Sequence, residues 1–322
     1  MSTLTTATTG PTTTKRGAEV LAPRPLVDVR QILIESNPFG PEQVKQLRSA
    51  VAGTQVGDVR QVLAELLNQS GLPVKAEVSY PGWPKDAKLL DGVDAIVVYA
   101  DGGGGNLLLP HLKEIDALAA KGVGIGMMHY CVECPKGPAS DQFLQLIGGF
   151  YETNHSCNPM WSPEFKSFPV HPVTRGVSPF STRDEWYMNL RFSPDAKPLL
   201  RATPSDAVRK GPYTAPAGPY PEVLERMGQE ETLMWALERP GGGRGFGFTG
   251  GHVHWNWGMP QQRTLILNAA AWLAKIEVPA TGVPSRKLSF ADLDRNHDDA
   301  KPAKFDAAAI ERQLAKWQGA GK

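Results

Sequence analysis

The sequence predicts an α/β protein built on a doubly wound, mainly parallel β-sheet with elaborated loops. Two observations lead to this prediction. Apolar segments of strand length alternate with segments whose apolar residues recur at helical spacing, as in a sheet covered by helices. Residues 94–99 and 123–128 are apolar runs of the kind that forms strands buried on both faces of a parallel sheet. The chain of 322 residues is long enough for one large domain of this type.

The first half of the chain supplies four strands of the predicted sheet. The first is expected at residues 27–34 and the second at residues 74–78, with helical spacing over residues 40–70 between them. The two apolar runs are the third and fourth strands, and an amphipathic helix at residues 107–121 joins them. Strands that alternate with helices favour parallel pairing, because parallel neighbours need a crossover connection.

The second half of the chain is less regular. Residues 149–230 are rich in proline and aromatic residues, and we interpret them as elaborated loops with short strands along one edge of the sheet. Two late strands are predicted at residues 231–238 and 245–249, followed by a helix at residues 260–275. The two late strands are therefore expected to complete the sheet that the first half of the chain begins.

Changes in composition divide the chain into three parts. Residues 1–25 are rich in threonine, alanine and proline without periodicity, and we expect a flexible arm there. Residues 26–278 form the predicted α/β domain. Residues 279–322 are a polar extension with a short helical pattern at residues 305–317, expected to pack on the body or on a neighbouring subunit of a homo-oligomer.

Charge and composition exclude several classes of partner. The formal net charge is +1 and no long basic or acidic run occurs, so neither nucleic acid nor a membrane surface is an expected partner. No apolar stretch approaches the roughly 18–20 residues of a membrane span. The start of the chain lacks the pattern of a secretory signal, so we expect a cytoplasmic protein, with export of a trimmed precursor left open. Three cysteines argue against a disulfide framework.

Polar residues follow the third and fourth predicted strands, where ligands bind in open α/β sheets. Asp101 and the glycines that follow it, among them Gly103 and Gly104, form either a tight turn or a ligand contact. Their spacing fits no phosphate-binding loop, so no nucleotide cofactor is expected. His129 ends the fourth strand, followed by Tyr130 and by Glu133, and this position favours catalysis over a purely structural histidine.

Two further clusters of candidate site residues contain histidine and aromatic side chains. His252 and His254 would point to the same face of an extended segment, where they could share a metal or divide ligand and base roles. The other interpretation is one stacked and one hydrogen-bonded histidine. Aromatic rings beside polar and acidic groups suit sugars, and these candidate groups are Asn154, His155, Glu185, Trp186 and Trp255.

Several segments together resemble the ThuA-like family, which is named for a trehalose-utilisation protein. The resemblance extends over about residues 78–274, well over half of the chain. The segments that carry it are GWP at 82–84, YADGGGG at 99–105, MHY at 128–130, GGFYETN at 148–154, FPVHPVTRG at 168–176, DEWY at 184–187 and RGFGFTGGHVHWNW at 244–257.

The resemblance implies a class I glutamine amidotransferase-like, flavodoxin-like sheet without the amidotransferase nucleophile. Where that class carries cysteine on a G-x-C-x-G elbow, this chain reads GMMHYC at residues 126–131. Cys131 lies close enough to that position to keep a cysteine-dependent amidase as an alternative, but we expect that its thiol is not a nucleophile. The resemblance also implies a small-molecule carbohydrate substrate and a divalent metal, with zinc preferred.

One departure from the family pattern affects the expected activity. Members usually carry a Ser-His-Gly stretch and a further histidine after the first strand, and residues 34–42 contain no histidine here. A carbohydrate-binding or scaffolding protein without turnover is therefore an alternative to an enzyme that isomerises, epimerises, hydrates or cleaves a sugar or 3-keto-glycoside.

The sequence thus predicts one shared pocket at the carboxyl ends of the strands. We expect His129, His252 and His254 to converge there as metal ligands, since three imidazoles and a carboxylate suit zinc. The predicted catalytic residues are His129, Glu133, His254 and Glu185.

Overall fold

The computed structural model describes residues 30–35, 59–79, 83–211, 213, 219–295, 301 and 303–319, with the backbone alone for the first range. The arm expected at residues 1–25, most of the helical segment expected at 40–58 and the histidine-free stretch beyond residue 35 lie outside the described residues.

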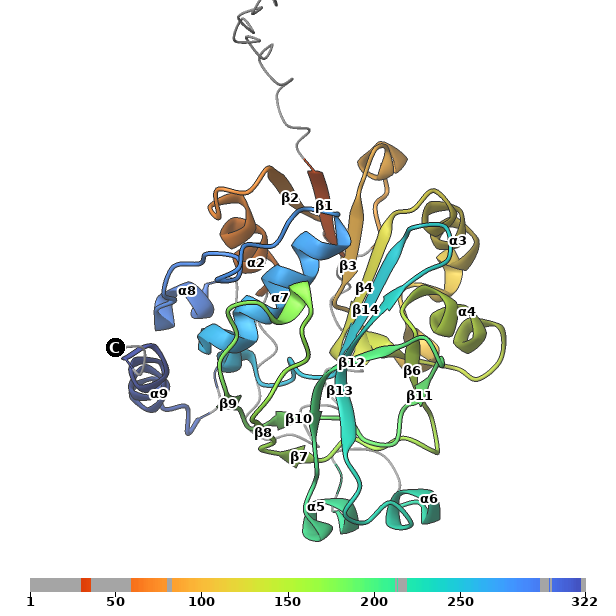
Figure 1. Cartoon of the computed structure of the whole chain (residues 1–322). Helices are drawn as coiled ribbons and strands as arrows, with labels where there is room; N and C mark the ends of the chain where they lie inside the picture. The colour runs from red at the N-terminus through yellow and green to blue at the C-terminus, as the bar shows by residue number, and fades with distance from the viewer. Residues whose placement is uncertain are drawn as a thin grey trace, which may run out of the picture.

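A seven-stranded mixed sheet forms the centre of the protein, in the order β12-β13-β14-β4-β3-β1-β2 (Figure 1). The parallel part, with its neighbours paired in register, comprises β1 (Arg30–Glu35), β2 (Val74–Ser79), β3 (Ala95–Val98), β4 (Gly124–Met128) and β14 (Arg244–Phe248). The antiparallel strands are β12 (Lys197–Ala202) and β13 (Glu231–Glu238). The predicted first, third and fourth strands therefore lie in one sheet, which confirms an α/β fold with a parallel core.

The antiparallel edge has a simple cause. Only residues 239–243 separate β13 from β14, and so short a turn can join antiparallel strands but not parallel ones. β14 then lies parallel to β4, which brings a late segment of the chain beside the middle of the sheet.

Helices cover both faces of the sheet (Figure 1). The α2 helix (Val59–Asn68) and the α7 helix (Pro260–Leu273) pack with Ala95 and Val97 of β3. The opposite face carries α3 (Leu112–Ala120) and α4 (Pro138–Leu146). Alternate residues of β3 point to opposite faces, so a strand of four buried apolar residues serves both cores.

Short strands and helices build the region between β4 and β13. The short strands are β5 (Glu133–Cys134), β6 (Gly149–Glu152), β7 (Met160–Trp161), β8 (Glu164–Phe165), β9 (Phe180–Ser181), β10 (Asp184–Glu185) and β11 (Arg191–Phe192). The short helices there are α5 (Asp206–Lys210) and α6 (Pro221–Leu224). The single-turn 3₁₀ helices of the described chain are η1 (Ala87–Leu90), η2 (Gly103–Gly105), η3 (Leu109–His111), η4 (His129–Val132), η5 (Pro172–Thr174) and η6 (His254–Gly258).

The C-terminal extension packs on the body beside α2 and α7 (Figure 1). It contains α8 (Phe290–Asp294) and α9 (Ala307–Gly319), the latter at the position of the predicted short helix. Leu293 and Leu314 are buried in the same apolar core as α7. Within the described residues, none of the helices has the length and apolar character needed to cross a membrane.

Candidate active site

Three neighbouring parallel strands end at the same edge of the sheet. Asp101 follows β3, His129 follows β4 and His252 follows β14, and these strands are adjacent in the order β14-β4-β3. Parallel neighbours place their carboxyl ends together, so residues far apart in sequence meet at this edge.

His129, His252 and Glu185 form a triangle of buried donor atoms. The Nε2 atom of His129 lies 3.2 Å from Nδ1 of His252 and 3.5 Å from Oε2 of Glu185. The third side, between Nδ1 of His252 and Oε2 of Glu185, measures 3.3 Å. Among the described residues, this is the one group of three or more His, Cys, Asp or Glu side chains whose donor atoms could hold a metal ion together.

The triangle has the dimensions of a metal site. A tetrahedral zinc ion with bonds of about 2.0–2.1 Å separates its ligand atoms by about 3.3–3.4 Å, close to all three sides. Two imidazoles and one carboxylate are a common catalytic ligand set, because they leave a position for water or substrate. The chemistry and spacing of these donors therefore fit a divalent metal.

The backbone around His129 fixes the direction of its ring. His129 has a φ of +54° at the turn from β4 into η4, a conformation that few residues other than glycine adopt. Its Nδ1 atom lies 2.9 Å from the carbonyl oxygen of Thr249, which can only accept, so Nδ1 carries the proton and Nε2 presents its lone pair to the triangle. Burial lowers the pKa of His129 against the opposing charge of Glu185, which favours the neutral imidazole.

His252 and Glu185 form the other side of the triangle. Burial alone would lower the pKa of the His252 imidazole, but the hydrogen bond and charge of Glu185 outweigh it, so the pKa is raised. The second oxygen of Glu185 accepts a hydrogen bond of 3.3 Å from the Asn158 amide. The ring of Tyr187, a buried residue of the core, lies 5.2 Å from that of His129 between ring centroids.

Asp184 holds the loop that carries His252, a role that the sequence did not reveal. Its fully buried carboxylate accepts from the backbone N–H groups of Gly251 (2.9 Å) and Val253 (3.0 Å) and from the Asn256 amide (3.0 Å). It also accepts from the N–H of Glu185 at 2.9 Å. One side chain therefore sets two corners of the triangle relative to each other.

His254 does not join this group, and the expected set of three imidazoles becomes two imidazoles and a carboxylate. The expectation assumed an extended segment, but Gly251 has a φ of +115° and η6 begins at His254, so the two histidines do not alternate as in a strand. The Nε2 atom of His254 lies 2.6 Å from the carbonyl oxygen of Leu293, to which it donates.

Tyr130 and Glu133 lie against the glycine loop after β3. A Cβ atom on Gly102 would lie 1.9 Å from the Tyr130 carbonyl oxygen, and one on Gly103 would lie 3.2 Å from the Tyr130 hydroxyl and 3.5 Å from Oε1 of Glu133. Thr153 donates to that Glu133 oxygen at 2.7 Å. Burial, with the nearby charge of Glu185, raises the pKa of Glu133. Gly104, in contrast, is exposed.

Asp101 is a buried carboxyl with one unused oxygen. Its side chain is 3% exposed, and Oδ1 has no hydrogen-bond partner among the described residues. Burial raises the pKa of Asp101 to about 7, so this group exchanges its proton near neutral pH.

The remaining predicted sugar-binding residues have other surroundings. Trp186 is fully buried between Phe165 and Phe248, with its indole N–H bonded to the Thr182 carbonyl, so its ring faces the core and not a ligand. We correct that prediction: buried and ligand-facing aromatic residues look alike in a sequence.

Asn154, His155 and Trp255 each contact another side chain of the protein. Asn154 is exposed and accepts from the Tyr220 hydroxyl at 3.5 Å, and His155 contacts the Asn189 amide at 3.1 Å. The Trp255 ring stacks on Phe290 of α8.

Cys131 is placed poorly for nucleophilic attack. The side chain is fully buried, and burial raises the pKa of its thiol far above neutral pH, despite an Asn106 amide 4.0 Å from Sγ. His129, not Cys131, occupies the kinked position directly after β4.

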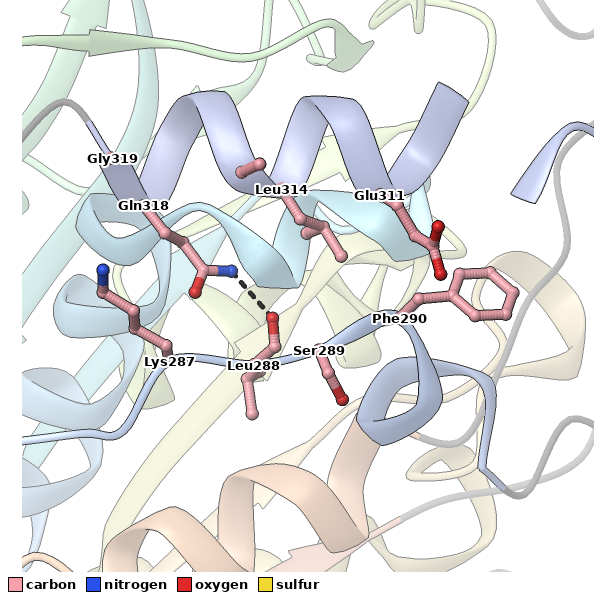
Figure 2. Close-up of a pocket in the computed structure, with 9 residues that line it drawn as sticks. Lys287, Leu288, Ser289, Phe290, Glu311, Leu314, Gln318 and Gly319 are labelled. Atoms are coloured by element: carbon pink, nitrogen blue, oxygen red, sulfur yellow. Dashed lines mark hydrogen bonds between the residues drawn. The ribbon is translucent and has the colours of Figure 1, made fainter. Parts of the chain in front are cut away.

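A cavity of about 380 Å³ lies elsewhere, between α9 and residues 287–290 (Figure 2). Leu314 and Gln318 of α9 face Leu288 across it, and none of its lining residues belongs to the predicted site.

The fold and the site define an α/β protein with a two-histidine, one-carboxylate group at the carboxyl ends of parallel strands. The profile of the family described as "ThuA: Trehalose utilisation" matches residues 49–273, more than half of the chain. The protein therefore belongs to the ThuA family.

A solved structure supports the same fold. A putative ThuA-like protein from Bacteroides uniformis ATCC 8492 is 15% identical, with a TM-score of 0.52 over 79% of this chain and 94% of that chain. A putative ThuA-like protein from Parabacteroides merdae ATCC 43184 is 14% identical, with a TM-score of 0.48 over 80% and 97%. None of the curated proteins compared with the chain matches it.

Proposed function

We propose that this protein is a sugar-modifying enzyme that works through a metal-assisted histidine and carboxylate site. The observation that carries the proposal is the buried triangle of His129, His252 and Glu185, with sides of 3.2, 3.5 and 3.3 Å. The family description, trehalose utilisation, supports a carbohydrate substrate. The proposed reaction is isomerisation, epimerisation, hydration or elimination on a sugar or 3-keto-glycoside.

The proposal places this site in a doubly wound, amidotransferase-like framework that has lost the cysteine nucleophile. Helices on both faces of the sheet and the kinked His129 at the end of β4 support it. The burial of Cys131 argues against a cysteine-dependent amidase.

In the proposed mechanism, His129, His252 and Glu185 would hold the ion. A divalent ion bound there would polarise a carbonyl oxygen of the substrate. The Thr249 carbonyl oxygen accepts a hydrogen bond from Nδ1 of His129, so Nε2 of His129 is unprotonated. The Asp184 carboxylate accepts from the N–H groups of Glu185 and Gly251 and so fixes Glu185 and the His252 loop relative to each other.

The groups proposed to transfer protons are the carboxyl groups of Asp101 and Glu133, near the glycine loop after β3. Chemistry next to a carbonyl needs a group that gains and loses a proton near the working pH. Asp101, with its pKa raised to about 7, has this property, and burial shifts the pKa of Glu133 in the same direction. The free Oδ1 of Asp101 and the Tyr130 hydroxyl are the groups proposed to meet sugar hydroxyls.

Metal content tests the first step of this proposal. We expect the purified protein to retain about one zinc ion per chain by mass spectrometry, and His252→Ala and Glu185→Gln to lose it, because each removes one of three ligands. His171→Leu is the matched control, since His171 packs on Trp272 outside the triangle. Equal zinc in the Glu185→Gln and control variants would contradict the metal site.

Turnover tests the second step. We expect the zinc-loaded protein to convert one of a panel of 3-keto-glucosides, followed by chromatography, and Glu185→Gln to convert none. The histidine-free stretch at residues 34–42 favours a carbohydrate-binding protein as the second candidate. Calorimetric binding of these sugars to zinc-loaded protein without any conversion would support that candidate.

A further inference from the structure

The C-terminal extension lies against the loop that carries His252. We propose that the described residues between 285 and 319, the C-terminal brace, set the position of His252 in the triangle, and that His254 and Trp255 are the positioning residues through which the brace acts. The inference rests on the proposed metal site and adds to it. The brace lies beyond residue 273, where the match to the family profile ends.

A buried hydrogen bond joins the loop to the brace. The imidazole of His254 is 3% exposed and donates from Nε2 to the Leu293 carbonyl oxygen at 2.6 Å. His254 lies two residues after His252, so this bond anchors the loop close to a metal-ligand position. Leu293 is itself fully buried, which makes it a fixed anchor.

Aromatic stacking gives a second attachment. The Trp255 ring stacks on Phe290 with centroids 5.2 Å apart and planes 16° apart, and Phe305 lies 5.7 Å away. The ammonium of Lys301 lies over both phenylalanine rings, at 5.3 and 5.2 Å from their centroids. Such ring contacts stabilise the packing beyond the area that they bury.

The end of η6 is held as closely as its start. A Cβ atom on Gly258 would lie 2.0 Å from a methyl carbon of Leu314, so α9 packs directly on the backbone there. Arg263 of α7 then bridges the two parts: its guanidinium donates to the carbonyl oxygens of Trp257 at 3.0 Å and Arg286 at 3.1 Å.

The loop needs these contacts because its own sequence does not fix it. Gly250 and Gly251 precede His252, and glycine leaves the backbone with many accessible conformations in the absence of outside contacts. Asp184 holds the loop from inside the protein, through Gly251 and Val253. The brace holds the same loop through His254 and Trp255. Asp184 and the brace together therefore define the direction of the His252 ring.

Paired substitutions at His254 test the brace. His254→Leu removes the donor to Leu293, whereas the amide of His254→Gln can still donate to it. We expect His254→Leu to weaken zinc binding about tenfold in competition with a chromophoric chelator, the low end for loss of a supporting contact. We also expect faster hydrogen exchange at residues 250–258. His254→Gln and the control His171→Leu should match the wild type in both measurements.

The outcomes separate the brace from the metal site. If the wild type binds zinc and His254→Leu binds it equally well with unchanged exchange, the brace proposal is overturned and the metal site stands. If the wild type binds no zinc, the metal proposal fails, and faster exchange in His254→Leu alone still supports the brace. Should His254→Leu fail to fold, Phe290→Leu, which removes the stacking on Trp255, takes its place with the same expected results.

Discussion

The two sides of the candidate site are built in opposite ways. On the β14 side, Asp184 accepts three hydrogen bonds from residues 251–256 and one from Glu185, and the Thr249 carbonyl holds the ring of His129. On the β3 side, Asp101 keeps an oxygen that has no partner within the described chain. A prearranged set of donors suits an ion, whereas a buried oxygen without a partner marks a group whose charge the protein does not balance.

The strongest test of the prearranged side is Asp184→Asn. Asparagine keeps the size but replaces an acceptor oxygen with an N–H₂ group that faces other donors. We expect zinc affinity to fall roughly 10–100-fold and the free energy of unfolding to fall by about 2–4 kcal/mol. Chelator competition and urea unfolding measure the two quantities.

Glu231→Gln is the matched control for that test. Glu231 is another buried carboxylate, 2% exposed, and it pairs with Arg209 at 2.7 Å outside the site. It should lose stability without losing zinc affinity. If both variants lost stability and neither lost zinc, Asp184 would have only a structural role, and the contrast between the two sides would weaken.

The glycine loop on the β3 side gives the next largest effect. Gly102→Ala places a methyl group 1.9 Å from the Tyr130 carbonyl oxygen, so the loop or η4 must move. We expect a loss of about 1–3 kcal/mol in the free energy of unfolding, together with weaker sugar binding. Gly104→Ala should change little, because a Cβ atom there meets nothing within 4 Å. Equal stability of the two variants would argue against the tight packing of this loop.

Asp101→Asn tests the buried carboxyl on the β3 side through the pH dependence of stability. In the folded protein the pKa of Asp101 is raised from 3.8 to about 7. The contribution of this group to the free energy of unfolding is therefore fully present below about pH 4 and is lost as the pH rises to about 7. Asparagine does not ionise, so the variant should gain stability relative to the wild type as the pH rises from about 4 to about 8. Urea unfolding at both pH values measures this gain, with exposed Asp116→Asn as control. A constant difference would refute the raised pKa.

The smallest effect is expected for Cys131→Ala. The thiol is buried and protonated, so its removal should leave turnover intact and cost about 1 kcal/mol of stability. Complete loss of turnover in a folded variant would restore the cysteine-dependent alternative.

The sequence predicted the sheet better than it predicted the surroundings of its site. Apolar runs such as residues 95–98 indicate buried strands because only a strand covered on both faces is apolar throughout. Strand ends then point to His129 and His252. The third corner, Glu185, comes from a two-residue strand with no periodicity, and the sequence predicted it as a catalytic residue but not as a metal ligand.

The sequence misplaced His254 and Trp186 and missed the role of Asp184 for the same physical reason. His254 was expected beside His252, but the turn at Gly251 and the 3₁₀ helix that follows break the alternation on which that expectation depended. Trp186 is in the core, and Asp184 acts through backbone N–H groups from a distant segment. Such partners are set by tertiary structure, which local patterns do not encode.

The left-handed backbone at His129 has a consequence for how this position would evolve. A φ of +54° costs a residue with a Cβ atom roughly 1–2 kcal/mol relative to glycine. The histidine therefore persists against a local preference, and glycine or asparagine would suit the backbone better. Under selection for thermal resistance alone, a library at residue 129 should drift toward these two residues, whereas selection for zinc retention should keep histidine.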